Sequence, residues 1–497
     1  MPAARSPATL VTESRYRLFA NATRASAALA ACAALLAGCA HVTPPERGGP
    51  PWIRLTSEHF RLVTDLPSPR AAAELDGLEQ TRAALLAGGF PGWPSPAGRS
   101  ELIVLRTRAE LAEFGGWLEA FGAGDGAGGL AFVLHGEDDV ERVRVLQYEL
   151  SVGLTLSLLR RLPFWLATGL GTYLETARID TARQLVITGE PTRELLAGAG
   201  HQRPGIRFNG WSTTPVAQNT RPWETVHFLL TERNAAFAGY LERLGRGEPP
   251  GAAFDALFPD LAGDRLTAAV VDYSRTILHS GRVKVATSPL PKRWAGATTA
   301  EPLSPAEVHA LFARLYRFSS WAARSQALRA RADAEVAEAL RLDPDQFDAL
   351  LLGPLDALPP PARKARLEAL VRLPAADHRA RLRLALEAAP GSLERIDALR
   401  NAAELDRDRP EALAALAQEL LWLDPAEALE AAERGQRLEP WRADLLAILA
   451  SAQASSGRCA DAAKTRAAAL DRVGPAGEAL PADLAVPLAV VEKACKL

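Results

Sequence analysis

Residues 144–175 read RVLQYELSVGLTLSLLRRLPFWLATGLGTYLE, and this stretch decides how the first half of the chain folds. Its first part repeats apolar residues every three or four positions, which predicts a helix whose buried face holds Val145, Leu146, Leu150, Leu154 and Leu158. A second helix is expected to begin at Pro163, because the N–H that proline lacks has no partner in a first helical turn. Its predicted buried residues are Trp165, Leu166, Leu170 and Tyr173.

Four residues of these helices stand where a metal-binding pattern places its chemistry. The stretch resembles the active-site helices of zinc metallopeptidases, in which the two histidines of H-E-x-x-H grip Zn²⁺ and the glutamate activates the metal-bound water. A Glu-Gly step on the next helix supplies the third ligand in that pattern. Here Tyr148 and Val152 replace the histidines, Thr168 replaces the third ligand, and only Glu149 remains. Because none of the three replacements is a good zinc ligand, we expect a relic motif with no catalytic residue, no bound metal and no cofactor.

The match extends beyond this motif. Residues 165–175 fit the pattern W-L-x-E-G-L-A-x-Y-x-E except at Thr168 and Gly171, and residues 223–230 (WETVHFLL) fit an aromatic helix with a His-aromatic-Leu step. The predicted order is a hairpin (52–55 and 59–64), helix (71–87), strand (101–106), helix (108–121), strand (130–134) and helix (138–161), with closing helices at 247–258 and 261–277. The sequence thereby resembles the peptidase-MA-like family of the gluzincin type, domain-of-unknown-function group 1570 in particular. That resemblance implies an α+β, zincin-like domain with a small mixed sheet over residues 52–280, here a pseudo-peptidase.

Other chemistries find little support in this region. The five histidines of the domain share no short ligand spacing, and His227 sits among apolar residues as a packed core histidine would; the five are His59, His135, His201, His227 and His279. A G-x-G-x-x-G pattern at Gly124, Gly126 and Gly129 follows a predicted helix and opens a strand, the reverse of a dinucleotide site, so a flexible loop is expected at 122–129. There is no G-x-S-x-G and no Walker A motif.

The first forty residues predict export. Four arginines precede a small apolar run at residues 25–37, which is too short to span a membrane and typical of a signal peptide. Leu36-Ala37-Gly38-Cys39 resembles the lipobox of bacterial lipoproteins, which implies cleavage of residues 1–38 and acylation of Cys39. Ala40 in place of Asp implies an outer-membrane lipoprotein that faces the periplasm. An ordinary signal peptide with a coincidental cysteine is the alternative. Residues 39–51 are predicted to be an irregular tether.

The second half of the chain reads as helix after helix. Residues 281–302 lack a clear period and are predicted to be a linker before a helical domain at 303–497. The helix-closing steps at 405–406 and 438–440 lie 33 residues apart, close to the tetratricopeptide period of 34. Gly457, Ala462 and Ala469 match its small positions. Such repeats form a solenoid that commonly binds proteins or peptides, although a helical array that only supports the first domain is the alternative.

Cysteine usage fits an oxidising compartment. Once Cys32 leaves with the signal peptide and Cys39 is acylated, Cys459 and Cys495 remain as an even pair. A disulfide between them would fasten the last helix to the array and contribute about 3–4 kcal/mol by restricting the unfolded chain.

Charge and composition narrow the function further. The 57 basic and 59 acidic residues give no excess positive charge that would attract nucleic acid. The leading hypothesis is a membrane-anchored lipoprotein with a non-catalytic domain and a protein- or peptide-binding helical domain. A zinc peptidase with atypical or relocated ligands and a purely structural envelope protein are the rivals.

Overall fold

The computed structural model describes residues 42–96, 99–114, 120–124, 130–159, 161–196, 221–280, 283–318, 325–353, 355, 358–373, 378–405, 407, 409–440, 442–471 and 482–496. Within these residues the fold is α+β, as predicted. The predicted signal peptide, the lipobox and Cys39 lie outside the described residues. No helix among those described combines the length and the apolar character that crossing a membrane requires.

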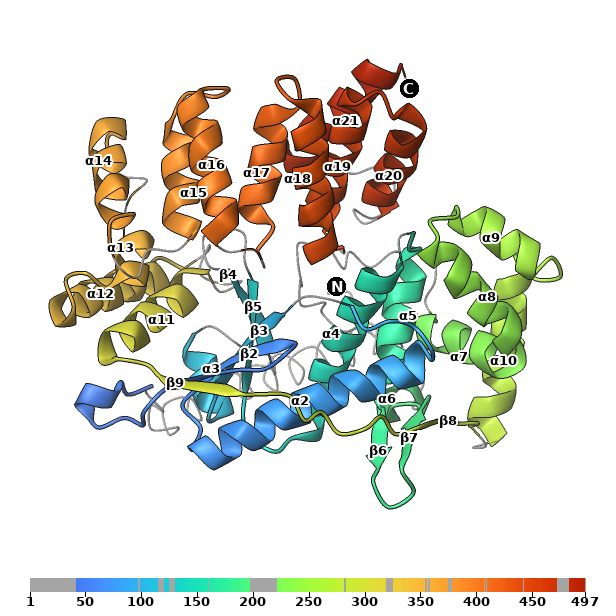
Figure 1. Cartoon of the computed structure of the whole chain (residues 1–497). Coiled ribbons are helices and arrows are strands. Elements are labelled where there is room, and N and C mark those ends of the chain that lie inside the picture. The colour runs from blue at the N-terminus through green and yellow to red at the C-terminus, as the bar shows by residue number, and fades with distance from the viewer. Residues whose placement is uncertain are drawn as a thin grey trace, which may run out of the picture. The chain divides into compact units, whose positions relative to one another are not determined.

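The first half of the chain alternates strands and helices around the predicted helix pair. Its elements are η1 (Pro45–Arg47), β1 (Ile53–Thr56), β2 (Phe60–Thr64), α2 (Ser68–Gly89), β3 (Ser100–Leu105), α3 (Arg108–Glu113), β4 (Ala120–Gly124), β5 (Leu130–His135), α4 (Val140–Leu158), α5 (Phe164–Leu174), β6 (Arg178–Asp180), β7 (Leu185–Thr188), α6 (Arg193–Leu196), α7 (Pro222–Glu232), α8 (Asn234–Gly245), α9 (Pro250–Leu257) and α10 (Arg265–Ser280). Figure 1 shows their arrangement, with α2 running across the sheet.

The larger sheet is mixed, with strand order β4-β5-β3-β2-β1-β9. Strands β2, β3 and β5 are parallel to one another, while β1, β4 and β9 (Thr299–Pro302) pair antiparallel with their neighbours. The register places Leu62 opposite Leu102, and Leu102 opposite Phe132. These three residues form one core with Leu75 of α2 and Leu146 of α4, so both helices pack on the same face of the sheet.

One predicted helix is shorter than expected. The prediction ran to residue 121, but α3 ends at Glu113, and Ala120–Gly124 form the edge strand β4. The sequence continues with Gly115 and Gly116, both poor helix formers, whose effect the apolar pattern concealed. The predicted flexible loop was also wrong in part, because Gly122 and Gly124 belong to this strand; Gly126 and Gly129 lie outside the described residues.

Two stretches predicted to be irregular contain short regular elements. Within the predicted tether, η1 forms a short 3-10 turn, and its Glu46 lies 2.9 Å from the His309 ring. Within the predicted linker, β8 (Ala286–Pro289) pairs with β7, and β9 pairs with β1. Both strands have four residues and depend on partners far away in the sequence, so no local pattern announces them.

The second half of the chain is helical. Its elements are α11 (Pro305–Phe318), α12 (Gln326–Leu342), α13 (Phe347–Leu352), α14 (Pro360–Leu370), α15 (His378–Glu387), α16 (Leu393–Leu405), α17 (Glu411–Leu420), α18 (Pro425–Leu438), α19 (Ala443–Ser455), α20 (Cys459–Asp471) and α21 (Ala482–Cys495). From α14 onward each helix packs on the next, and Figure 1 shows them in a row.

Helix α11 packs on the sheet as well as on α12. The Phe312 ring meets Trp52 at 5.5 Å and Phe114 at 5.7 Å between ring centroids. Arg314 donates two hydrogen bonds, of 3.0 and 3.2 Å, to the carboxylate of Glu101 on β3. Arg314 and Arg409 hold the pKa of Glu101 at about 2 despite its burial. The first helix of the predicted helical domain therefore also covers the sheet.

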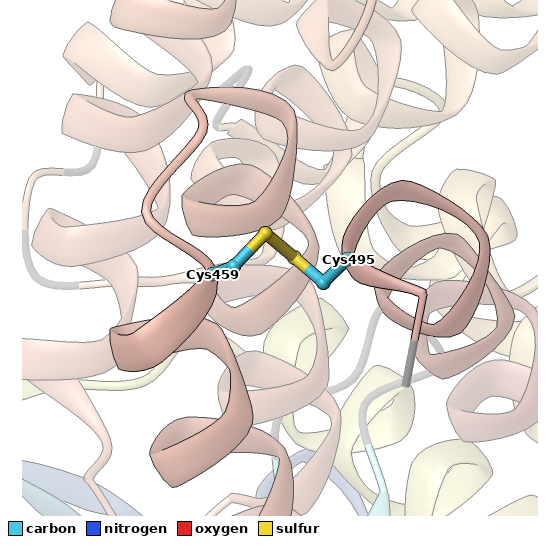
Figure 2. The surroundings of a disulfide bond; sticks show 2 residues. All are labelled: Cys459 and Cys495. Atoms are coloured by element: carbon cyan, nitrogen blue, oxygen red, sulfur yellow. A yellow bond between two sulfur atoms is a disulfide. The ribbon is translucent and has the colours of Figure 1, made fainter.

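The predicted cysteine pair forms a disulfide. Cys459 begins α20 and Cys495 ends α21, and their Cα atoms lie 5.4 Å apart (Figure 2). The bond joins the last helix of the chain to the hairpin before it, which is the fastening that the sequence predicts.

Candidate functional site

The candidate site is the contact between α4 and α5. Asp139 caps α4 by accepting a hydrogen bond of 2.8 Å from the backbone N–H of Glu141. Arg144 of α4 lies 3.2 Å from the buried carboxylate of Glu175, directly after α5, and Gln147 donates to the Ala177 carbonyl at 3.0 Å. These polar contacts fix how the two helices lie against each other.

Tyr148 and Val152 both face α5, at Gly171. A Cβ atom placed on Gly171 would lie 2.8 Å from Cε2 of Tyr148 and 3.0 Å from Cγ2 of Val152. Both side chains are 8 % exposed and belong to one apolar core. The two positions that would carry the zinc-binding histidines thus lie on one face of α4, as i,i+4 spacing requires, but they are occupied by packed apolar groups.

The opposite side of α5 is equally close to α7. A Cβ on Gly169 would lie 2.5 Å from Cγ2 of Val226 and 2.7 Å from the Pro222 carbonyl oxygen. Glycines at 169 and 171 therefore let α5 fit tightly between two helices. The resemblance pattern has glycine at the first of these positions and alanine at the second, so Gly171 is the departure that makes room for the Tyr148 ring.

The other two residues of the motif are Thr168 on α5 and Glu149 on α4. Thr168 is half-buried and precedes Gly171 by three residues, close to one helical turn, so the two share a face of α5. Its carbonyl oxygen accepts a hydrogen bond of 2.9 Å from the Thr172 hydroxyl. Glu149 is 5 % exposed. The structure thus places Tyr148 and Val152 at Gly171, with Thr168 on the same face of α5, while Glu149 is buried next to Tyr148 in the sequence of α4. The four residues offer one carboxylate, a phenol and a hydroxyl but no imidazole.

Three of the predicted buried residues are less buried than expected. Trp165 is half-buried at the start of α5, and Leu158 is half-buried at the end of α4. Both lie in a terminal turn of their helix, where fewer neighbours can cover a side chain. Leu150, in the middle of α4, is also half-buried and packs at the edge of two cores.

His227, which the sequence predicts to be a core residue, is a core residue in the structure. His227 is fully buried, stacks on Trp223 at 4.4 Å, and places Nε2 2.8 Å from the Lys284 carbonyl oxygen. Because a carbonyl only accepts, Nε2 must donate, and Nδ1 is left to accept from the Tyr273 hydroxyl at 2.8 Å. Burial lowers the pKa of His227, so the ring is neutral at pH 7.

Of the remaining predicted histidines, His59 and His135 are described. His135 ends β5 with its side chain fully buried, and its carbonyl oxygen accepts a hydrogen bond from Arg142. Nδ1 of His59 lies 2.8 Å from Glu79. His201 and the side chain of His279 lie outside the described residues.

One cluster in the described chain, which the sequence analysis missed, has the ligand types of a metal site. Ligand atoms of Glu46, His309 and Glu338 lie within 4.8 Å of one another. However, Nε2 of His309 already meets Glu46 and Nδ1 meets Glu335, while Arg341 pairs with Glu338 at 2.8 Å. The ring is thus engaged on both sides.

A positive charge on His309 accounts for the carboxylates that surround its ring. Burial lowers the pKa of His309, but its hydrogen bonds to Glu335 and Glu46 outweigh that effect and raise the pKa above its ordinary value. A protonated ring donates to both carboxylates and joins η1 to α11 and α12. Glu46 is so far from its partners in the sequence that only the fold could bring them together.

Three cavities within the described residues, of about 410, 590 and 630 Å³, are lined by residues other than the four of the relic motif. The first lies against the C-terminal helices, and the second lies between the sheet and the helices α11, α13 and α15. Comparison with protein-family models and with curated proteins finds no match for this chain.

Proposed function

We propose that this chain is a non-catalytic binding protein of the bacterial cell envelope. In this proposal, acylated Cys39 holds a lipoprotein at the outer membrane, facing the periplasm. Residues 52–280 form a degenerate gluzincin-like domain, and residues 303–497 form a tetratricopeptide-like domain that binds a protein or peptide. No nucleic acid and no metal cofactor takes part.

The packing of Tyr148 and Val152 on Gly171 carries the proposal. A catalytic zinc needs three protein ligands and an open position for water. At this contact the two ligand positions on α4 hold side chains that fill the space against α5, and Thr168 offers only a hydroxyl on the third. Glu149 without a metal has no bound water to activate.

The spacing of the C-terminal hairpins supports the proposal of a tetratricopeptide-like domain. Helices α15, α17 and α19 begin at His378, Glu411 and Ala443, which are 33 and 32 residues apart. Each is followed by a second helix that packs on it, as in repeats of about 34 residues. Large apolar side chains are also exposed along α15 to α18, at Leu386, Leu393, Leu405, Trp422 and Leu423.

The disulfide supports the proposed location in the periplasm. Cys459 and Cys495 are joined, and disulfides persist in the periplasm but rarely in the cytosol. The location therefore agrees with the export signals in the sequence.

Metal content and peptidase activity test the loss of catalysis. The purified wild-type protein should hold far less than one equivalent of Zn²⁺ by elemental analysis and should cleave casein no faster than the Glu149→Gln variant. Stoichiometric zinc, together with cleavage that Glu149→Gln abolishes, would establish a peptidase with atypical ligands instead.

Cross-linking tests the binding role. A photo-reactive amino acid at position 422, where the tryptophan side chain is 64 % exposed, should give a discrete adduct in living cells. The same label at Val140, which is 77 % exposed on the first domain, serves as the matched control. A purely structural helical array predicts no adduct at either position.

A further inference from the structure

A cavity of about 410 Å³ lies between the C-terminal ends of α4 and α8 and the helices α18, α19 and α20. Pockets for small ligands usually measure roughly 300–1,000 Å³. No residue of α5 or of the relic motif lines it. An inference about this cavity therefore goes beyond the proposed function and does not depend on the loss of catalysis.

The floor of the cavity is apolar. It is built from four buried side chains: Leu159, Leu446, Leu449 and Ala468. They come from both halves of the chain, since Leu159 follows α4 while the other three belong to α19 and α20. Such a floor favours an aliphatic group over a fully hydrated ion.

One polar side chain in this apolar surface lacks a partner. Gln453 of α19 is 7 % exposed and lines the cavity, and its Oε1 atom is buried without a hydrogen bond to any described residue. A buried acceptor without a donor costs about 1–3 kcal/mol. Because Gln453 lines the cavity, a turn of its amide that brings Oε1 to the cavity surface would let a ligand N–H remove that cost.

The rim of the cavity is cationic. Five basic residues line it, Arg161, Arg246, Arg437, Arg458 and Lys464, against the two acidic residues Glu433 and Asp461. Both acids lie next to Arg458, at 3.4 and 2.9 Å. Arg437 and Lys464 are exposed and form no ion pair with a described residue. The rim can therefore attract an anion.

We infer that this cavity binds a carboxylate with an aliphatic side chain and an adjacent amide N–H. The carboxylate lies at Arg437 and Lys464, the aliphatic group lies on the leucine floor, and the N–H is donated to Gln453. This chemistry is shared by N-acylated amino acids and by the carboxyl end of a peptide chain. A fatty acid lacks the amide, and inorganic phosphate lacks the apolar group.

Calorimetric titration of the full-length mature protein tests the site with four probes. They are N-acetyl-leucine, a pentapeptide that ends in leucine with a free carboxylate, the same pentapeptide with a terminal amide, and 4-methylpentanoate, which is leucine without its nitrogen. N-acetyl-leucine, the pentapeptide with a free carboxylate, or both should bind. The amidated peptide should bind about tenfold more weakly than its acid, because it lacks the charge. 4-Methylpentanoate should bind more weakly than N-acetyl-leucine.

Three variants separate the contributions of the carboxylate and of the amide N–H to ligand binding. The double variant Arg437→Glu/Lys464→Glu should weaken binding of the acids about tenfold or more, while Lys493→Glu, a matched reversal at an exposed lysine of α21, should leave it unchanged. Gln453→Leu should weaken binding of N-acetyl-leucine but not of 4-methylpentanoate, because only the former donates an N–H.

The outcomes also identify the source of the ligand. Binding of the pentapeptide alone indicates a chain end, and binding of both indicates that a free small molecule suffices. Equal affinity for the acid and the amide, an effect of the double variant no larger than that of Lys493→Glu, or no saturable binding of either acid would overturn the inference. Zinc in the wild type would contradict the proposed function but would not alter this titration.

Discussion

Replacing Gly171 with alanine tests the packing at the relic motif. In an exposed helix interior this change gains about 1 kcal/mol, because alanine is the better helix former. At Gly171 the new methyl group would lie 2.8 and 2.9 Å from two atoms of the Tyr148 ring and 3.0 Å from Val152. Both side chains are 8 % exposed and have little room to move. Overpacking of this kind costs about 1–3 kcal/mol, so after the gain in helix propensity we expect a net loss of up to about 2 kcal/mol.

Gly153→Ala is the matched control, since Gly153 also lies inside a helix of this pair and a Cβ there meets nothing within 4 Å. It should raise the free energy of unfolding by up to about 1 kcal/mol. Urea unfolding followed by tryptophan fluorescence compares the two variants with wild type. In a Tyr148→Leu background, most of the cost of Gly171→Ala should disappear, giving a coupling of about 1 kcal/mol or more. Equal stabilisation by Gly171→Ala and Gly153→Ala would refute the described contact.

Three further predictions concern anchoring, the disulfide and pH. Cys39→Ser should move the protein from the membrane fraction to the soluble periplasm, because the acyl chains are its proposed hold on lipid; a variant that still sediments with membranes would rule out the lipobox. The intact mature protein should weigh about 2 Da less than its reduced form, and alkylation of Cys459 and Cys495 without reductant would contradict this. The folded-state pKa of Glu101 is about 2, below its ordinary 4.5, so its stabilisation is complete above pH 4.5 and is lost as the pH falls towards 2. Glu101→Gln should therefore cost about 3 kcal/mol at pH 7, and the difference from wild type should shrink in acid; a difference that does not change with pH would show that the Arg314 pair is not its cause.

The elements that the sequence predicted well are those with a strong local period. The helix pair α4 and α5 carries apolar residues at helical spacing, and the β1–β2 hairpin was bounded by a clear turn at residues 57–58. The strands that were missed, β4, β6, β7, β8 and β9, have three to five residues each, too few for a clear alternating pattern. In addition, β8 and β9 pair with segments far away in the sequence, which leave no periodic signal in their own residues.

The candidate site was predictable to a similar degree. The sequence indicated Tyr148, Val152 and Thr168 as replaced ligands, and i,i+4 spacing put the first two on one face of α4. It noted Gly171 only as a mild departure, because nothing local shows which side chain lies above a glycine. Gln453 gave no signal either, since an amide without a partner is recognised only from its burial.

Zinc binding by a restored ligand set tests the proposed origin of this domain most directly. The triple change Tyr148→His, Val152→His, Thr168→Glu puts two imidazoles on the α4 face that meets Gly171 and a carboxylate one turn away on α5. The first change also removes the ring that fills the contact. Calorimetric titration should give near one equivalent of Zn²⁺ for the folded triple variant and far less for wild type, although activity need not return, because the groups that orient the ligands are not restored. A folded triple variant that takes up no zinc, or a wild type that binds it stoichiometrically, would contradict the proposal.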